Sequence, residues 1–294
     1  MTSADISTAD AGLASAAPRR VTPRKKRGNS LPLGILGWVV GIVFFFPVLW
    51  MVITSFKTEV QAYTNTPHLF FSPTLSQYKA VFDSGIWPYV ANSAFATVVS
   101  TILVLLLATP CAFALSLRPV RKTRDVLFFF ISTKMLPVVA AIIPIYIAAR
   151  DLHLLDNIFT LVILYTAMNL PIAVWMMQSF LAEVPVAVIE AAQIDGARLP
   201  TILARVVAPI SLPGIAATAL ICFIFSWNEL LFARVLTGVV AETAPVFLTG
   251  FITSQGLFLA KVCAASLVIS LPVLAAGFAA QDKLVQGLSL GAVK

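Results

Sequence analysis

Charged side chains are scarce in this chain of 294 residues. Only 11% of the residues are Asp, Glu, Lys or Arg, whereas 59% are hydrophobic and the mean hydropathy is +0.94. So few charges cannot keep so much apolar surface in water. The composition therefore excludes a soluble globular protein and indicates a protein that crosses a membrane several times.

Residues that bind metals or form disulfides are also few. His68 and His153 stand alone in predicted loops, without the ligand spacing of a zinc site. The three cysteines lie in apolar runs, where Cys behaves as a small hydrophobe. An integral-membrane enzyme needs paired His, Cys or carboxylate groups near the interface, and the scarcity of these groups argues against an enzyme. We therefore expect no metal, no disulfide and no catalytic residue.

The sequence contains no Gly-rich loop that ends in Gly-Lys-Ser or Gly-Lys-Thr, so it predicts no cradle for nucleotide phosphates. If ATP drives this protein, another subunit binds the nucleotide, and we expect no cofactor in this chain. The formal net charge of +7 does not indicate nucleic acid as a partner, because the basic excess precedes the first apolar run. Anionic membrane lipid and the retention of basic loops in the cytoplasm already explain that position.

Six apolar runs are long enough to cross a membrane. About twenty residues at about 1.5 Å per residue cross about 30 Å of hydrocarbon as a helix. Because backbone groups in lipid must be satisfied within the segment and alternating strands are absent, these runs should be helices. The sequence therefore predicts an all-α membrane protein with six transmembrane helices. The predicted spans are roughly 32–56, 91–117, 126–149, 157–181, 209–233 and 260–281.

Basic residues set the orientation, because Lys and Arg in short loops are retained in the cytoplasm. Six of them precede the first span and four lie between the second and third, and six spans place both groups on one side. The N- and C-termini should therefore be cytoplasmic, together with a polar segment at 182–208. We expect residues 1–30 to be a disordered basic tail and residues 31–294 to be the transmembrane domain. The first apolar run is too long for a signal-peptide core and should be an uncleaved anchor.

The polar segment 182–208 lies between two membrane-length apolar runs. Glu190, Ala191 and Ile194 are three or four residues apart and share one helix face, and Gly196 can end that helix in a turn. The pattern predicts a short helix, a bend and a second helix outside the bilayer. Considered alone, it is also compatible with a solvated loop helix that ends in an ordinary capping glycine.

The residues Glu190-Ala191-Ala192, then Asp195-Gly196-Ala197, with Pro209 further on, resemble the cytoplasmic signature loop of bacterial ABC importer permeases. The family usually has Leu before that proline, where this chain has Ala208. The resemblance implies coupling helices that dock in a groove of an ATPase subunit and transmit its nucleotide-driven closure. It implies that the ATPase contact surface is formed by Glu190, Ala191, Ala192, Asp195, Gly196 and Ala197.

The same resemblance implies the location and the partners of the chain. The location is the bacterial inner membrane, in which the chain is a multi-pass subunit. The implied partners are a second homologous permease subunit, an ATPase dimer and an extracytoplasmic substrate-binding protein. Arg198 and Arg205 are candidate internal ion-pair partners for the two carboxylates of the signature loop.

A second resemblance concerns the substrate. The run Phe225-Ser226-Trp227-Asn228-Glu229-Leu230-Leu231-Phe232 and the tail 287–294 resemble the maltose-type carbohydrate permeases. A Trp ring can stack on a sugar while Asn and Glu side chains hydrogen-bond to its hydroxyl groups. Interfacial anchoring of Trp227, and helix capping or pairing by Asn228 and Glu229, explain these residues nearly as well.

Lys134 is the one strong charge deep in a predicted span, about eight residues or about 12 Å from its start. Lys near the middle of a bilayer costs roughly 2.5 to 3.5 kcal/mol, so it usually faces a cavity or a partner. The partner is either Glu229 or, without an acid, water and backbone carbonyls. Lys134 is therefore a substrate-path candidate, with snorkelling or structural pairing as alternatives. The surrounding run 132–137, followed by 143–146, most resembles sorbitol and mannitol permeases.

These features predict a permease subunit of an ATP-driven importer for a sugar or sugar alcohol, which forms the translocation path with a second permease. One alternative is a disaccharide importer of the maltose or trehalose type. Another is an ion-coupled secondary transporter, which usually shows internal repeats and ionisable groups at mid-membrane. No clear repeat is visible, and the signature loop has no purpose in a stand-alone carrier.

Overall fold

A computed structural model describes residues 31–64, 70–117, 122–253 and 256–291. The predicted tail at 1–30 and the last residues of the C-terminal tail, 292–294, lie outside this range. The chain divides into two units, residues 1–47 and 48–294, and the helix bundle discussed below belongs to the second unit. The first helix, α1 (Leu31–Ser55), continues from the first unit into the second.

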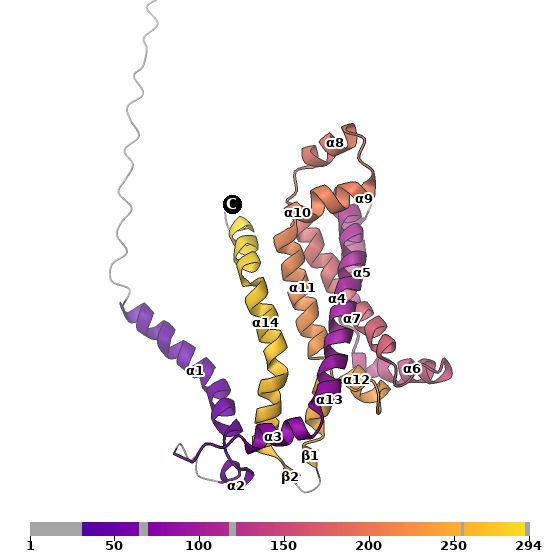
Figure 1. Cartoon of the computed structure of the whole chain (residues 1–294). Coiled ribbons are helices and arrows are strands. Elements are labelled where there is room, and N and C mark those ends of the chain that lie inside the picture. The colour runs from indigo at the N-terminus through magenta and orange to yellow at the C-terminus, as the bar shows by residue number, and fades with distance from the viewer. Residues whose placement is uncertain (1–30, 65–69, 118–121, 254–255, 292–294) are drawn as a thin grey trace, which may run out of the picture. The chain divides into compact units, whose positions relative to one another are not determined.

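Helices form nearly all of the regular secondary structure in the described residues, as the composition predicts (Figure 1). A two-stranded antiparallel hairpin pairs β1 (Ile252–Thr253) with β2 (Gly256–Leu257). After α1, the helices are α2 (Glu59–Ala62), α3 (Ser76–Asp83), α4 (Ile86–Leu117), α5 (Thr123–Thr133), α6 (Val138–Asp151), α7 (Ile158–Leu181), α8 (Val186–Ile194), α9 (Leu199–Ile202), a π-helical turn (Leu203–Val207), α10 (Ala208–Ile210), α11 (Leu212–Trp227), α12 (Leu231–Leu236), α13 (Ala244–Thr249) and α14 (Leu259–Gly291).

Among the described residues, four helices are long and apolar enough to cross a membrane without a break: α1, α4, α7 and α14. Two bent pairs complete the six predicted spans if each pair counts as one span. The first pair, α5 and α6, bends by 80°, and the second, α9–α10 with α11, bends by 86°. The all-α membrane fold is confirmed, and the third and fifth predicted spans, at 126–149 and 209–233, are each interrupted by a bend.

Proline chemistry explains where the two spans break. Pro137 directly precedes α6, and its ring restricts Leu136 and removes a backbone donor. Pro213 occupies the first turn of α11, where a missing N–H costs little, so the chain restarts a helix there after the bend at Ser211. The fifth span also ends earlier than predicted, at Trp227. Continuous helices accommodate Pro47, Pro110, Pro144, Pro171 and Pro272.

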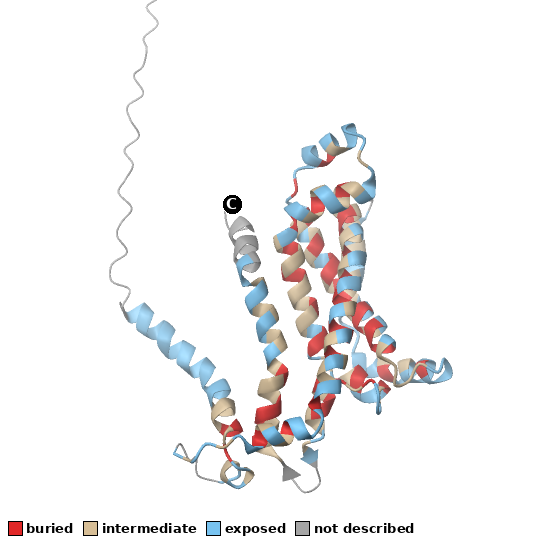
Figure 2. Ribbon diagram, viewed as in Figure 1, coloured by how far each residue is buried: buried red, intermediate tan, exposed pale blue. Residues whose placement is uncertain are grey.

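The core of the second unit lies where α4, α7 and α11 pack together (Figure 2). Ala108 and Ala112 on α4 and Ala173 on α7 are fully buried, and such small side chains let membrane helices approach closely. Helices α11 and α7 approach closely at Gly214, where an added Cβ would lie 2.7 Å from the Cβ of Phe180 on α7. The packing of α11 against α7 therefore depends on a glycine.

Polar groups also join the three core helices. The Asn169 amide on α7 donates to the Ser226 hydroxyl on α11 at 2.9 Å, and Ser226 lies 3.3 Å from the hydroxyl of Ser100 on α4. All three residues are buried. Interhelical hydrogen bonds of this kind hold membrane helices in register.

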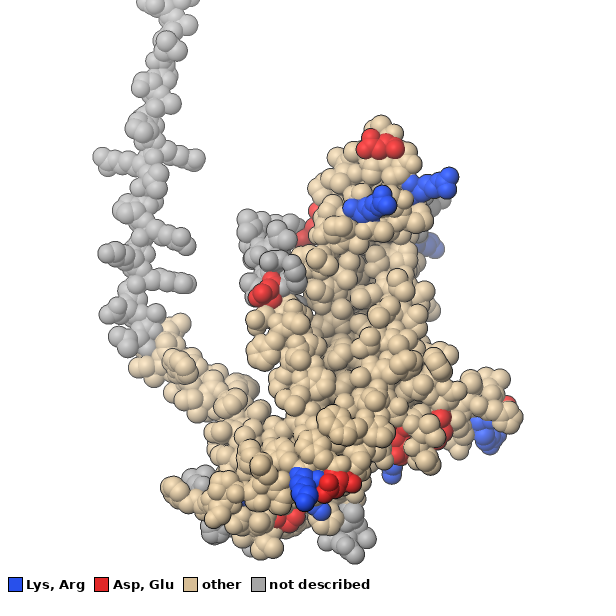
Figure 3. Space-filling view, viewed as in Figure 1, with Lys and Arg blue, Asp and Glu red and all other residues tan. Residues whose placement is uncertain are grey.

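The two ends of the second unit carry different elements. Helices α8 and α9 lie at one end, and α3, α13 and the hairpin lie at the other (Figure 1). On the face shown in Figure 3, charged side chains gather toward these two ends and the middle of the bundle is apolar. This arrangement agrees with the predicted sides: 182–208 is at one end, and the described parts of the loops near 57–90, 150–156 and 234–259 are at the opposite end.

Candidate functional site

The signature loop folds as a helix, a bend and a second helix, so that part of the prediction is confirmed. Helix α8 is closed by Gly196, whose φ of +76° is strained for any residue with a side chain. The Gly196 N–H donates to the Gln193 carbonyl and the Ala197 N–H to the Ala192 carbonyl, each at 3.0 Å. This pair of bonds is a Schellman motif, which satisfies the last carbonyls of a helix.

The six residues of the predicted ATPase contact surface lie on two faces of this loop. Glu190, Ala191, Asp195 and Gly196 are exposed. Ala192 and Ala197, which the Schellman bond joins, are partly buried and pack against the core cluster. The neighbouring Ile189 is buried to 4% exposure, whereas Ile194 is 86% exposed. The outer face therefore presents two carboxylates, Ala191 and Ile194, whereas Ala192 and Ala197 form the base of the loop.

The charged residues of the loop do not neutralise one another. Within the described part of the chain, Glu190, Asp195, Arg198 and Arg205 form no ion pair. The internal pairing considered for Arg198 and Arg205 is therefore not present. The carboxylates remain available to a protein that docks on α8.

The loop is joined to the fifth span through continuous, packed structure. The π-helical turn at Leu203–Val207 follows α9 directly and leads into α10 and α11. Ile202 and Val207 are buried in the same core cluster as Ile189. Packed side chains therefore connect α8 to the segment that leads into α11.

Lys134 caps the C-terminus of α5, at the break of the third span. Its Nζ donates to the Met168 carbonyl of α7 at 3.1 Å and lies 5.8 Å from the centroid of the Phe225 ring on α11. No acid is paired with it among the described residues, so the backbone-carbonyl alternative holds and pairing with Glu229 does not. Lys134 thus joins α5, α7 and α11 at an interruption of the membrane helix.

Trp227, Asn228 and Glu229 lie at the end of α11. The Trp227 ring is 2% exposed, stacks on Phe223 and donates its N–H to the Ile269 carbonyl at 3.2 Å. Asn228 is exposed and its amide donates to the Ile224 carbonyl at 2.8 Å. The Glu229 carboxylate accepts from the N–H groups of Phe232 and Ala233, at 2.9 and 3.3 Å. Both polar residues therefore perform the capping considered as the alternative.

A groove of about 490 Å³ brings Trp227 and Asn228 together with α13 and α14. Its polar groups include the hydroxyl-bearing residues Ser266 and Ser270 of α14. Lys134 and Glu229 do not line it. Two of the four predicted substrate-path residues thus share one groove, and the other two lie apart from it.

Asp156, a residue to which the sequence did not point, has a φ of +52° in the turn before α7. Its carboxylate accepts five hydrogen bonds, at 2.9 to 3.1 Å, from the N–H groups of residues 238–241. Burial opposes ionisation, but the backbone donors outweigh it and hold the pKa of Asp156 below its ordinary value. The only local signal is a polar Asp156-Asn157 turn between two apolar runs, and nothing in it points to residues 238–241.

Comparisons with known proteins agree with this arrangement. A sequence model of the family described as "Binding-protein-dependent transport system inner membrane component" matches residues 105–288. The chain is 39% identical over 264 residues to the probable ABC transporter permease protein y4oR of Sinorhizobium fredii, which covers 89% of this chain and 95% of the relative. It is 32% identical over 258 residues to the diacetylchitobiose uptake system permease DasC of Streptomyces coelicolor, covering 87% and 93%.

Two further similarities concern an archaeal relative and a solved structure. The trehalose/maltose transport system permease MalG of Thermococcus litoralis is 28% identical over 261 residues, covering 87% of this chain and 94% of the relative. The crystal structure of a bacterial ABC transporter that imports the acidic polysaccharide alginate contains a similar chain, with a TM-score of 0.71 and 25% identity. That similarity covers 90% of this chain and 100% of the other.

Proposed function

This chain belongs to the family of binding-protein-dependent transport system inner membrane components, and from that premise we propose that it is the transmembrane permease subunit of an ATP-driven importer of sugars or sugar alcohols. As an ABC permease it is a multi-pass inner-membrane component that is not itself catalytic. The observation that carries the proposal is the similarity to sugar permeases along nearly the whole chain. An ion-coupled secondary transporter does not fit a binding-protein-dependent family.

Membership in this family implies an ATPase and a binding protein as partners. We propose that the ATPase docks on the outer face of α8, through Glu190, Ala191, Asp195 and Gly196. These residues are exposed, and their carboxylates form no ion pair within the part of the chain that the structure describes; both observations support the assignment. Carboxylates that are not paired internally can accept charge-assisted hydrogen bonds from Arg or Lys of a partner. Ala192 and Ala197 then act indirectly, by seating α8 on the bundle.

The proposed mechanism is alternating access, in which partners favour different conformations of the bundle and so shift its population. Closure of the ATPase dimer would displace α8, and the packed π-helical turn would carry the displacement to α11. A second, homologous permease subunit would supply the other wall of the path. The groove at Trp227 and Asn228 and the bend at Lys134 are the parts of this subunit that we assign to the path.

The relatives favour an oligosaccharide, because their names specify diacetylchitobiose and trehalose or maltose. The runs around Lys134 resemble sorbitol and mannitol permeases, so a polyol remains the second candidate substrate. Both candidates are polyhydroxylated and uncharged. The groove beside Asn228, with its serine hydroxyl groups, offers hydrogen-bonding groups that suit either one.

The testing experiment is uptake into vesicles that contain this subunit with its neighbouring permease, ATPase and binding protein. Radiolabelled sorbitol, mannitol, maltose and trehalose are compared with and without ATP. ATP-dependent uptake of a disaccharide establishes the importer and removes the polyol assignment. ATP-dependent uptake of a polyol establishes both the importer and the polyol assignment. Uptake by this chain alone, driven by an ion gradient, overturns the proposed function.

A further inference from the structure

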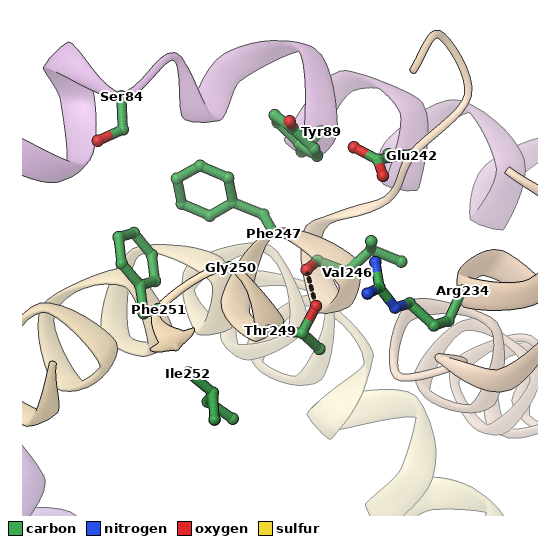
Figure 4. A pocket seen from close by; sticks show the side chains of 10 residues that line it. All are labelled: Ser84, Tyr89, Arg234, Glu242, Val246, Phe247, Thr249, Gly250, Phe251 and Ile252. Atoms are coloured by element: carbon green, nitrogen blue, oxygen red, sulfur yellow. Dashed lines mark hydrogen bonds between the residues drawn. The ribbon is translucent and has the colours of Figure 1, made fainter. Parts of the chain in front are cut away.

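A second cavity, of about 520 Å³, lies at the end of the bundle opposite α8 (Figure 4). Small-molecule sites typically enclose about 300 to 1,000 Å³. The cavity is lined by residues from the start of α4, from α12 and from α13. It shares Thr249 and Ile252 with the groove that Trp227 and Asn228 line, so the cavity adjoins the groove.

The walls of this cavity carry opposite charges that are not paired with each other. Arg234 and Glu242 both line it, yet neither forms an ion pair with any residue that the structure describes. The Glu242 carboxylate lies beside the Tyr89 hydroxyl (Figure 4). A guanidinium presents only donors and a carboxylate only acceptors, so together they match hydroxyl groups, which do both.

Aromatic rings supply the apolar part of the same cavity. The rings of Tyr89 and Phe247 are 4.9 Å apart, and those of Phe247 and Phe251 are 5.1 Å apart. An aromatic surface beside hydrogen-bonding groups suits a sugar, whose ring has an apolar face and polar edges. This combination distinguishes the cavity from an ordinary polar loop surface.

The wall that carries Glu242 is held rigidly by remote side chains. Asp156 fixes the backbone of residues 238–241, as described above. The Asn92 amide of α4 donates to the carbonyls of Val240 and Glu242, at 2.8 and 2.9 Å. Ser93 accepts from the Ala244 N–H at 2.8 Å. A binding residue on a backbone fixed in this way loses little conformational entropy when it meets a ligand.

We propose that this cavity is an outer vestibule site, which takes one polyhydroxylated unit of the transported substrate before that unit reaches the groove. Glu242 and Arg234 bind the hydroxyl groups, and Asp156 is a positioning residue. The proposal rests on the proposed function, because it identifies the ligand with the imported sugar or sugar alcohol.

The test is saturation-transfer NMR on the complete complex in nanodiscs, with maltose, trehalose or sorbitol and without binding protein or nucleotide. The wild type is expected to bind the substrate that it transports. Glu242→Gln and Arg234→Gln should each weaken that binding about tenfold, the change expected when a hydrogen bond to a charged group is lost. Asp156→Asn should weaken it less. The matched control is Asp151→Asn, in the exposed Arg150–Asp151 ion pair outside the cavity.

ATP-dependent uptake is measured on the same preparations, so that a failure of the vestibule site can be distinguished from a failure of the proposed importer function. If the wild type transports a sugar but does not bind it without binding protein, or if both cavity variants bind it as the wild type does, the vestibule is ruled out while the importer stands. Unchanged sugar binding with weakened stimulation of the ATPase by the binding protein would show a protein-docking surface instead, and would also overturn the proposal. Absence of uptake by the wild type would remove the proposed function itself.

Discussion

The two ends of the bundle use their polar groups in opposite ways. At α8 the backbone closes on itself through the Schellman motif, and Glu190 and Asp195 form no ion pair with the described residues. At the other end, Asp156 and Asn92 direct their side chains onto the backbone of a distant segment, residues 238–242. The side chains of the loop that we propose as the docking site are thus available to a partner, whereas side chains from elsewhere in the fold fix the wall of the proposed cavity.

The largest effect is expected from breaking the local closure at α8. Gly196→Val places a β-branched residue at a φ of +76°, where residues with a side chain lose roughly 1 to 2 kcal/mol and β-branched residues more. We expect ATP-dependent uptake to fall by more than about tenfold, because the turn that seats α8 cannot form. Co-purification of the ATPase and vesicle uptake measure the effect.

Gly196→Asn is the control, because Asn tolerates left-handed backbone better than other residues with a side chain. It should retain most of the uptake. Normal transport by Gly196→Val would remove the coupling assignment of this loop.

A somewhat smaller effect is expected from a substitution in α11, the helix that runs between the two ends. Gly214→Val places atoms against Phe180, where even an added Cβ would overlap the side chain. Overpacking of a core costs about 1 to 3 kcal/mol, so the melting temperature of the purified subunit in detergent should fall. Phe180→Ala in the same chain should recover part of the loss, because the two positions are in contact. Additive destabilisation would contradict the close approach of α7 and α11.

The opposite end is tested by removing its organising carboxylate. Asp156→Ala leaves the N–H groups of residues 238–241 without their acceptor, which should destabilise that end by about 1 to 3 kcal/mol. Hydrogen exchange of residues 238–241 should therefore increase while exchange in α8 stays unchanged. Faster exchange in both regions would show that the two ends are not independent.

The Asp156 carboxylate should also make the stability of this end of the bundle depend on pH, in a direction that follows from its pKa. The backbone donors hold the pKa of Asp156 below its ordinary value in the folded protein. Its stabilising contribution is therefore full above the ordinary Asp pKa of about 3.9 and is lost as the pH falls through the lower folded-state value. Exchange at residues 238–241 in the wild type should approach that of Asp156→Ala only under such acidic conditions.

The contrast between the two ends also explains what the sequence could predict. The turn at Gly196 was predictable because its hydrogen bonds join residues five or fewer positions apart, within one recognisable pattern. The bond between Asp156 and Gly238 spans 82 positions, and no local pattern pairs them. The capping roles of Asn228 and Glu229 were foreseeable as alternatives, because they too are local.

The broken spans were not predictable from hydropathy. Helix α5 ends at Thr133, before Pro137, whereas Pro144 is accommodated inside α6. Each proline removes one backbone donor, so the residue type alone does not decide which proline lies at a break. The hydropathy of 126–149 is therefore that of one span, although its backbone turns by 80°.

The smallest effect is expected from substituting Lys134, which lies at that turn and combines features of both ends of the bundle. Like Asp156 it directs its charge onto a backbone group, the Met168 carbonyl, and like Glu190 it is exposed and without an acidic partner among the described residues. If its charge serves the substrate path, Lys134→Met should lower uptake about threefold to tenfold and leave assembly intact, and Lys134→Arg should restore it, because Arg keeps the charge and the donors. Unchanged uptake would remove Lys134 from the path. Reduced assembly of the complex would instead show that Lys134 has a structural role and joins α5 to α7, much as Asp156 joins two loops. A residue that only contacts substrate has no reason to affect how the subunits associate.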